Sequence, residues 1–179
     1  MYNGASNTII QLMRLFIGIK LPSSLHHHCQ KLQEYFPDLK KTSDFHLTLQ
    51  FLGDAISEVQ LPAITSALTL IDFKPFDIEM GDAVSFSNPY HPQGVWVECK
   101  MTPGLQKISG DVRSAMTTVG FCPDKPFKAH ITLGRYKTPP EHGPLCVKGE
   151  PRTFTVSQFH LMKSELTPNG PRYQTIETF

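Results

Sequence analysis

Two copies of a histidine–threonine motif are the residues of this sequence whose types and spacing could do chemistry. The first copy is HLTL at residues 46–49, and the second is HITL at residues 130–133. Each copy reads histidine, apolar residue, threonine, apolar residue. A shuffled chain of this composition would contain roughly 0.1 such matches. We therefore interpret the pair as a repeated functional motif rather than as two unrelated surface strands.

The spacing within each motif predicts that its polar side chains share one face of a strand. Residues i and i+2 of a strand point the same way, so His46 would lie beside Thr48, and His130 beside Thr132. Near neutral pH one imidazole can accept a proton while the other donates one. The threonine hydroxyls and the planar guanidinium of Arg135 could bind phosphate oxygens. This set predicts acid–base chemistry on a phosphoryl group.

The elements that must position these residues follow from hydrophobic periodicity. The pattern predicts helices over residues 25–36, 61–71 and 105–119, and strands over residues 15–19, 46–52, 76–86, 95–99, 125–137, 153–162 and 172–179. Strands and helices do not alternate strictly, so the class is α+β with mainly antiparallel sheets. Strand, helix, motif strand and helix recur in each half, which indicates an internal duplication.

Two other readings of the histidines need weighing. A zinc site is one, but catalytic zinc generally takes a third protein ligand and supporting carboxylates, and neither motif contains them. The run His26-His27-His28 lies within a predicted helix, where consecutive side chains diverge, so it should not bind one ion. Trp96, with apolar neighbours in its strand, is expected to belong to the core. We expect no metal and no cofactor.

The composition predicts a globular protein without a strong overall electrostatic field. The chain has 179 residues and a net charge of +1, so an anion site must be local. Its four cysteines show no metal-binding spacing, which favours free thiols, and no apolar run is long enough to span a membrane. We expect a cytoplasmic monomer without a membrane segment. Residues 1–12 read as a leader or an artificial extension, and residues 13–179 as a single bilobal domain.

Four segments resemble one protein family: FIGIKLP, FHLTLQFLGD, KPFKAHITLGR and the C-terminal LMKSELTPNGPRYQTIETF. Together they are similar to the two-histidine (2H) phosphoesterases, in particular to the RNA 2′,3′-cyclic phosphodiesterases, also called 2′-5′ RNA ligases. The resemblance covers residues 13–179. It implies a bilobal fold in which two pseudo-symmetric, mainly antiparallel sheets flank a central cleft, with helices outside. It also implies metal-independent hydrolysis of a 2′,3′-cyclic phosphate to a 2′-phosphate, with reversible 2′-5′ ligation as a further expectation.

The resemblance implies roles for six residues. His46 would protonate the O3′ leaving oxygen, and His130 would activate water. The others would bind substrate: Thr48, Thr132 and Arg135 the phosphate, and Phe51 the terminal base. The chain departs from the family pattern at Lys20, where an aspartate is usual, and at Ala129, where proline is frequent. Expected partners are RNA ends or small nucleotides carrying a cyclic phosphate. The alternatives are a non-catalytic RNA-end-binding module, or a phosphodiesterase acting on a small cyclic or 2′-5′ linked nucleotide.

Overall fold

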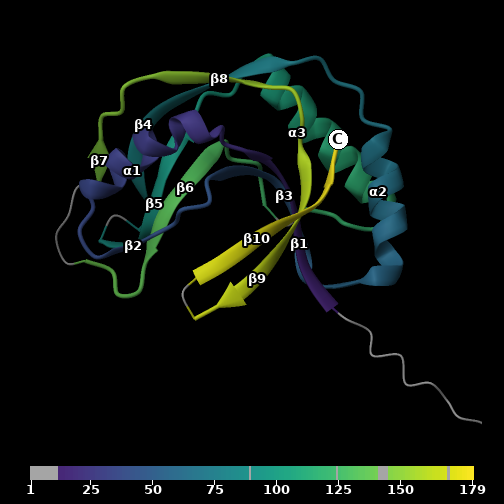
Figure 1. Cartoon of the computed structure of the whole chain (residues 1–179), viewed down its shortest axis with the longest axis horizontal. Coiled ribbons are helices and arrows are strands. Elements are labelled where there is room, and N and C mark those ends of the chain that lie inside the picture. Colours follow the sequence, from purple (N-terminus) through teal and green to yellow (C-terminus); the bar gives the residue numbers. More distant parts are fainter. Residues whose placement is uncertain (1–11, 89, 124, 141–144, 169) are drawn as a thin grey trace, which may run out of the picture.

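A curved, fully antiparallel sheet forms the centre of the protein (Figure 1). The computed structural model describes residues 12–88, 90–123, 125–140, 145–168 and 170–179. The strands are β1 (Leu12–Lys20), β2 (Leu39–Lys41), β3 (His46–Ser57), β4 (Phe76–Asn88), β5 (His91–Cys99), β6 (His130–Tyr136), β7 (Cys146–Val147), β8 (Arg152–Val156), β9 (His160–Thr167) and β10 (Gly170–Thr178). Their order is β10-β9-β1-β3-β6-β5-β4-β7, with β2 beside β6 and β8 beside β4.

Three α-helices cover the outer side of the sheet (Figure 1): α1 (His26–Glu34), α2 (Leu61–Thr69) and α3 (Pro103–Thr118). They confirm the three helices that the sequence predicts. In α3 the apolar stripe is fully buried, and Thr102 caps the first turn by accepting a hydrogen bond from the Leu105 N–H at 3.3 Å. Gly120 follows with a φ of +90°, a conformation that suits glycine and ends the helix.

The two halves of the sheet meet at one residue pair between the motif strands. Leu47 of β3 lies opposite Ile131 of β6, and both are fully buried. The α+β class and the antiparallel pairing are as predicted. The two predicted sheets are hydrogen-bonded at this pair into one sheet, and the buried side chains of both halves form one continuous hydrophobic cluster.

One predicted strand is wrong. The segment 153–162 divides into β8, which pairs with β4, and β9, which pairs with β1. The chain leaves one half of the sheet after Val156 and enters the other at His160, with Phe159 fully buried between them. Ser157 and Gln158, both exposed, interrupt the alternation of apolar residues between the two strands, and this two-residue interruption is the local signal of the break that the prediction overlooked.

The predicted C-terminal hairpin is confirmed as β9 and β10. It forms one edge of the sheet, with β10 outermost, and its turn approaches β2 (Figure 1). There Lys40 donates a hydrogen bond from Nζ to the Pro168 carbonyl at 3.4 Å. Within the described residues no helix is long and apolar enough to cross a membrane.

Candidate active site

The two motifs present four polar side chains on one face of the sheet. Directly opposite residues of an antiparallel pair point the same way, and neighbours along a strand point the other way. Leu47 and Ile131 face the core, so the histidine and threonine on either side of each face away from it. Continuing this register sets His46 opposite Thr132, and Thr48 opposite His130. The four are partly exposed, and we refer to His46, Thr48, His130 and Thr132 as the quartet.

A β-bulge follows each motif and brings one further residue to the quartet's face. In β3 the register to β1 moves from Gly18–Thr48 to Ile17–Gln50, so Leu49 is an extra residue. In β6 the register to β5 moves from Trp96–Thr132 to Val95–Gly134, which makes Leu133 the extra residue. An extra residue reverses the alternation of the strand.

The reversal explains why the fifth residue after each histidine belongs to the site. Phe51 pairs with Phe16 and Arg135 with Gly94, and these partners face the same way as Gly18 and Trp96 respectively. Strict alternation would have turned Phe51 and Arg135 toward the opposite face. The structure therefore groups all six residues that the sequence assigns to the site.

Close packing of the backbone at Gly94 helps to position the side chain of Arg135. A side chain at Gly94 would place its Cβ 2.4 Å from the Gly134 carbonyl and 2.8 Å from the Phe86 ring. Because Gly94 has none, Phe86 can stack on Trp96 with ring centroids 4.6 Å apart. The Arg135 guanidinium then lies over the Phe86 ring, 5.3 Å from its centroid, in cation–π geometry.

His46 is surrounded by aromatic rings and one nearby carboxylate. Its ring centroid lies 4.9 Å from that of Phe16 and 4.6 Å from that of Tyr173. Its Nδ1 is buried with no hydrogen-bond partner among the described residues. Burial lowers the pKa of His46, and the carboxylate and backbone of Asp44 oppose this effect. His130 and Lys20 lower the pKa further, with smaller effects.

His130 has an aromatic neighbour, and the charges that shift its pKa are those of two cations. Its ring centroid lies 4.3 Å from that of Trp96, and Nδ1 is 2.8 Å from the Lys128 carbonyl, to which it donates. Burial lowers the pKa of His130, and the charges of Arg135 and Lys128 lower it further, against the hydrogen bond to the Lys128 carbonyl. With Nδ1 protonated, Nε2 is the free nitrogen of the neutral ring.

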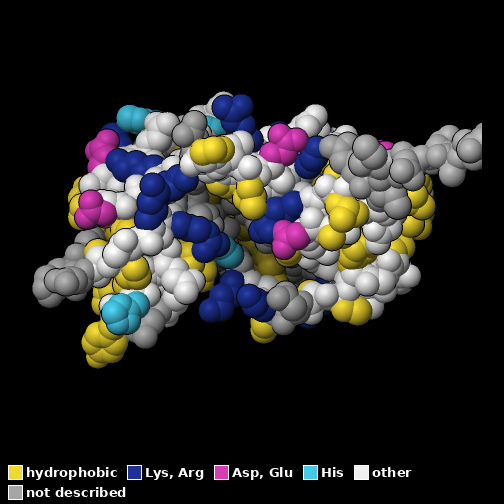
Figure 2. Space-filling model, turned by 90° about the horizontal axis from the view of Figure 1, so that it is seen from below, with side chains coloured by type: hydrophobic (Ala, Val, Ile, Leu, Met, Phe, Trp, Pro, Cys, Tyr) yellow, Lys and Arg dark blue, Asp and Glu magenta, His cyan; other side chains and the backbone are white. Residues whose placement is uncertain are grey.

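Positive charge gathers around the cleft. Viewed from below, Lys and Arg side chains surround a hollow in which a histidine is visible (Figure 2). Lys20, Lys128 and Arg135 act on the histidines electrostatically, and Arg14 and Arg135 act on Tyr173. The protein as a whole carries a net charge of only +1, so this field is local, as the sequence predicts.

Phe51 forms an exposed aromatic surface at one end of the cleft. It remains 42% exposed, and the Arg14 guanidinium lies 4.4 Å from its ring centroid. Arg14 also forms an ion pair with Asp54, which restrains it against Phe51. A ring held in this way can stack on a nucleobase.

The described residues contain no group of three or more His, Cys, Asp or Glu side chains that could hold a metal ion. The three consecutive histidines diverge, as predicted. His26 Nε2 lies 3.1 Å from the Leu21 carbonyl, His27 is exposed, and His28 Nε2 is buried without a described partner.

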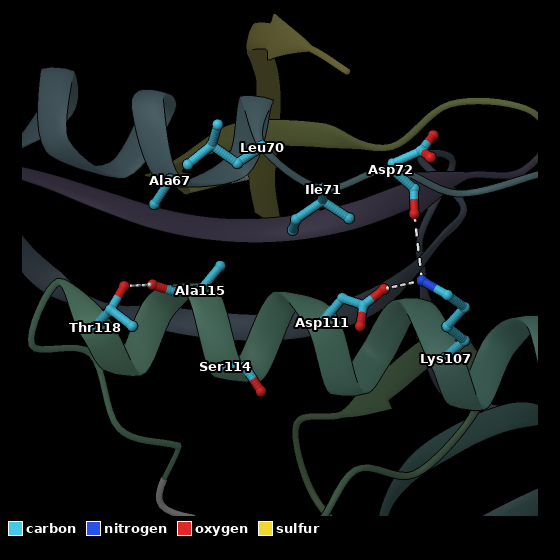
Figure 3. Close-up of a pocket in the computed structure, with 9 residues that line it drawn as sticks. All are labelled: Ala67, Leu70, Ile71, Asp72, Lys107, Asp111, Ser114, Ala115 and Thr118. Atoms are coloured by element: carbon cyan, nitrogen blue, oxygen red, sulfur yellow. Dashed lines mark hydrogen bonds and ion pairs between the residues drawn. The ribbon is translucent and has the colours of Figure 1, made fainter.

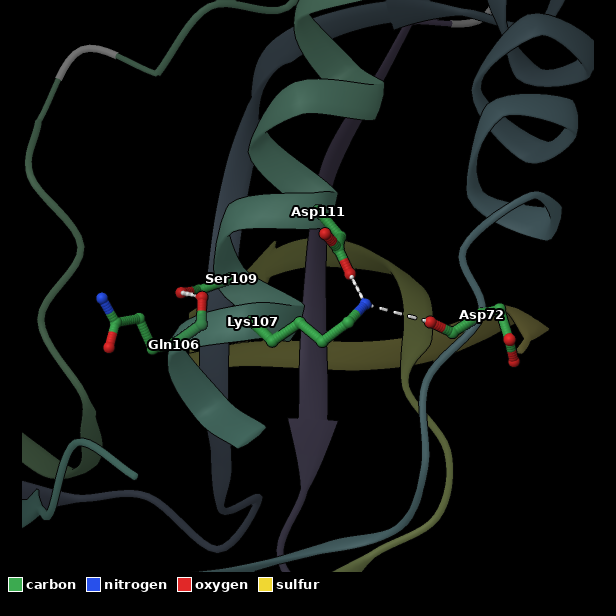
Figure 4. Close-up of polar contacts among 5 residues, drawn as sticks. All are labelled: Asp72, Gln106, Lys107, Ser109 and Asp111. Atoms are coloured by element: carbon green, nitrogen blue, oxygen red, sulfur yellow. Dashed lines mark hydrogen bonds and ion pairs between the residues drawn. The ribbon is translucent and has the colours of Figure 1, made fainter. Parts of the chain in front are cut away.

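A groove of about 430 Å³ lies between α2 and α3, and none of the quartet lines it (Figure 3). At one end Lys107 bridges the two segments (Figure 4), donating to the Asp111 carboxylate at 2.6 Å and to the Asp72 carbonyl at 3.2 Å. Lys107 and Asp111 are therefore paired with each other at this end of the groove. We place the candidate site at the quartet.

Sequence reasoning missed three rings beside the histidines. Trp96 is not a core residue as expected; it is partly exposed and packs on His130, while Val95 and Val97 are fully buried. Alternation within its strand could have revealed this. Tyr173 and Phe16 contact His46 from β10 and β1, and no local signal marks Tyr173 because it is 127 residues away in sequence.

The chain is similar to proteins of known family in sequence and in fold. Residues 21–168 match the family model of the 2′-5′ RNA ligase superfamily. A protein of Archaeoglobus fulgidus named RNA 2′,3′-cyclic phosphodiesterase is 32% identical, with 93% of this chain and 99% of that protein covered. One of the same name from Aeropyrum pernix is 35% identical over 74% of this chain and 80% of its own length.

Solved structures of similar proteins have the same fold. The crystal structure of TT0787 of Thermus thermophilus has a TM-score of 0.81 and 30% identity, covering 93% of this chain and 97% of that one. Escherichia coli LigT, solved in complex with 3′-AMP, has a TM-score of 0.80 and 25% identity, covering 94% and 98%. Sequence, fold and a duplicated histidine–threonine motif gathered on one face lead to the same conclusion: this chain belongs to the 2′-5′ RNA ligase superfamily of 2H phosphoesterases.

Proposed function

We propose that this protein is an RNA 2′,3′-cyclic phosphodiesterase that opens the cyclic phosphate to a 2′-phosphate without a metal ion. The observation that carries the proposal is the quartet, which brings two histidines and two threonines to one cationic face across the Leu47–Ile131 pair. The names of the relatives support the same reaction class. Hydroxyl donors and a guanidinium neutralise the phosphate while the two imidazoles move protons.

The geometry supports a direction for the reaction. His46 lies next to Thr132 and therefore at the Arg135 end of the quartet, whereas His130 lies next to Thr48, at the Phe51 end. In a ribose the base is attached to C1′, next to C2′, and the 5′ carbon is attached to C4′, next to C3′. With the base on Phe51, O2′ points toward His130 and O3′ toward His46.

Each histidine then has one role. Water attacks phosphorus on the side opposite O3′ and gives its proton to His130 Nε2, while the P–O3′ bond breaks. His46, as imidazolium, gives its proton to O3′, which leaves as a hydroxyl, and the phosphate remains on O2′. Asp44 favours the charged form of His46, and the cations around His130 favour its neutral form.

The reverse reaction uses the same groups with their proton roles exchanged, because opening and closing share one transition state. We therefore expect slow 2′-5′ ligation when a 2′,3′-cyclic end and a 5′-hydroxyl end are both present at high concentration. A non-catalytic RNA-end-binding module would show neither reaction.

The decisive experiment is hydrolysis of a 2′,3′-cyclic mononucleotide in excess chelator, with separation of the 2′- and 3′-phosphate products. Turnover to the 2′-phosphate supports the proposal and the assignment of O3′ as the leaving oxygen. Binding without turnover would identify a recognition module. Activity lost to chelator and restored only by added zinc would overturn metal independence.

His46→Ala and His130→Ala should each lower kcat by roughly 10²–10⁴-fold, which is the usual contribution of a general acid or base. The double variant should lose less than the product of the two single losses, because groups that act as a unit are not additive. Near-normal turnover in either single variant would contradict the paired mechanism. Unchanged circular dichroism and melting temperature would exclude unfolding as the cause.

A further inference from the structure

Two cations lie directly opposite each other at one end of the cleft. Lys40 of β2 pairs with Arg135 of β6, so both side chains point to the face that carries the quartet. Like charges at such positions repel. Among the ion pairs of the described residues, none includes either cation, although six other Lys and Arg residues do form one. The pair therefore favours an anion between them.

Lys40 reaches across the open end of the cleft. Its Nζ donates to the Pro168 carbonyl at the tip of the β9–β10 hairpin, over 3.4 Å and in an exposed position. Its Cε would lie 3.7 Å from a Cβ at Gly170. A hydrogen bond of this length to a neutral acceptor leaves most of the ammonium charge available, and a phosphate oxygen is the stronger partner.

The chemistry of an RNA end directs a second phosphate to this position. The cyclic phosphate occupies the C2′–C3′ edge of the ribose. The base is attached next to C2′ and the 5′ carbon next to C3′, so these two groups lie at opposite ends of that edge. If the base stacks on Phe51, the 5′ oxygen leaves the quartet at its Arg135 end. In a mononucleotide that oxygen is a neutral hydroxyl, whereas in an RNA chain it carries the next phosphodiester.

We propose that Lys40, together with Arg135, forms a subsite for the phosphodiester on the 5′ side of the terminal nucleotide, so that the protein selects RNA ends over cyclic mononucleotides. This inference rests on the proposed function and specifies its substrate class. Arg135 would contact both phosphates, and Lys40 only the second one.

The test compares kcat/KM for a dinucleotide ending in a 2′,3′-cyclic phosphate with kcat/KM for the corresponding cyclic mononucleotide. We expect the wild type to prefer the dinucleotide. A dinucleotide with an uncharged methylphosphonate link keeps both bases and removes the internal charge, and we expect it to lose this preference. A preference that survives this replacement would show recognition of the second base, and would overturn the inference.

Variants assign the effect to Lys40. Lys40→Ala and Lys40→Gln should each lower the ratio of the two kcat/KM values about fivefold, the upper range for an exposed charge pair. Glutamine can still donate to the Pro168 carbonyl, so a wild-type ratio in Lys40→Gln would show that Lys40 only holds the hairpin. Lys41→Ala is the matched control, because Lys41 is also exposed but points to the opposite face by strand alternation.

The outcomes separate this inference from the proposed function. If the wild type opens neither substrate, the proposed function fails. If it opens both with equal kcat/KM, the proposed function stands and the subsite is wrong. An equal drop in the ratio for Lys41→Ala and Lys40→Ala would indicate a general loss of positive charge, and would also contradict a specific subsite.

Discussion

The two histidines occupy equivalent positions of a repeated motif, but the residue two positions before each of them differs in charge. Asp44 precedes His46 and Lys128 precedes His130, and the Lys128 carbonyl accepts a hydrogen bond from His130 Nδ1 at 2.8 Å. The carboxylate of Asp44 raises the pKa of His46 against the effect of burial, while the charge of Lys128 lowers that of His130. We infer that this difference distinguishes the acid from the base.

A pH profile tests this inference. The profile of kcat/KM should be bell-shaped, with its alkaline limb reporting loss of the acid and its acid limb reporting loss of the base. Asp44→Asn should lower the pKa of His46 and move the alkaline limb to lower pH. Lys128→Gln should raise the pKa of His130 and move the acid limb to higher pH.

Both variants should therefore narrow the bell. If His46 were the base, Asp44→Asn would instead move the acid limb to lower pH, and the bell-shaped profile would become wider. Glu58→Gln is a suitable control, because Glu58 is an exposed carboxylate in the short 3-10 helix after β3, away from both motifs, and is not among the charges that shift either histidine.

The threonines and Arg135 should contribute to catalysis and not to folding. Thr48→Val and Thr132→Val keep the shape and strand preference of threonine and delete one donor each. Loss of a donor to the transition state costs about 3–4 kcal/mol in a well-enclosed site, and these partly exposed positions should lose less. Arg135→Lys keeps the charge without the two-pronged donor geometry and should also lower kcat/KM.

The measurement is kcat/KM together with the melting temperature for all three variants. Reduced kcat/KM with an unchanged melting temperature is the expected result. Early melting with normal activity per folded molecule would show that the hydroxyls are structural, and would leave only the histidines in the catalytic proposal.

At the level of elements, the bulges connect the fold with the site. Each one follows the threonine of its motif and turns the next site residue to the correct face. The second bulge is held by Gln33, a buried residue of α1, whose Nε2 donates to the carbonyl of Leu133 at 2.7 Å. The Thr42 N–H donates to the same carbonyl at 3.0 Å. The helix thus fixes the position of Arg135 through the backbone.

Gly94→Ala tests how tightly this region is packed. Its Cβ would collide with the Gly134 carbonyl and the Phe86 ring, so we expect a loss of about 1–3 kcal/mol in the free energy of unfolding. Displacement of Arg135 should also lower kcat/KM. Urea titration and steady-state kinetics measure the two effects.

Gly110→Ala is the matched control. Apart from the adjacent residues and the local helix backbone, no atom lies within 4 Å of a Cβ at this position in α3, and replacing glycine by alanine in a helix stabilises it by roughly 0.5–1 kcal/mol. Activity should not change. If the two variants had equal free energies of unfolding, the backbone around Gly94 would be able to accommodate a Cβ without loss of stability.

At the scale of the whole molecule, four histidines among the described residues have a pKa below the usual 6.5: His28, His46, His130 and His160. Burial is the largest cause in each. Their folded forms favour the neutral ring, so the unfolded chain binds more protons as the pH falls below 6.5. The stability present above pH 6.5 should therefore be lost progressively as the pH falls through the lower pKa values of the folded state.

His160 offers a test outside the quartet. It is 4% exposed, and its Nδ1 lies 2.9 Å from the Thr178 hydroxyl. His160→Gln can keep a hydrogen bond and cannot titrate, so the slope of unfolding free energy against pH below 6.5 should become smaller. His27→Gln, at an exposed position, should leave the slope unchanged. An unchanged slope in His160→Gln would show that His160 does not contribute.

The sequence alone was enough to predict the chemistry of the candidate site, because the information is local. A histidine and a threonine two residues apart share a strand face in any sheet, and their repetition identifies both halves of the site. The three helices followed from apolar periodicity and from signals such as Thr102 and Gly120. The resemblance supplied Phe51, which alternation alone would have placed on the wrong face.

Only the tertiary structure decided which distant groups join that site. The bulges at Leu49 and Leu133 depend on register with neighbouring strands, and a local pattern does not encode register across strands. Tyr173 beside His46 and Lys40 opposite Arg135 arise from pairings between segments far apart in the chain. The break between β8 and β9 falls at the exposed Ser157 and Gln158, and only the strand pairings show that so short an interruption separates two strands. The residue types of each motif could be identified from the sequence, whereas the neighbours that shift the pKa values of the histidines depend on strand pairing and packing.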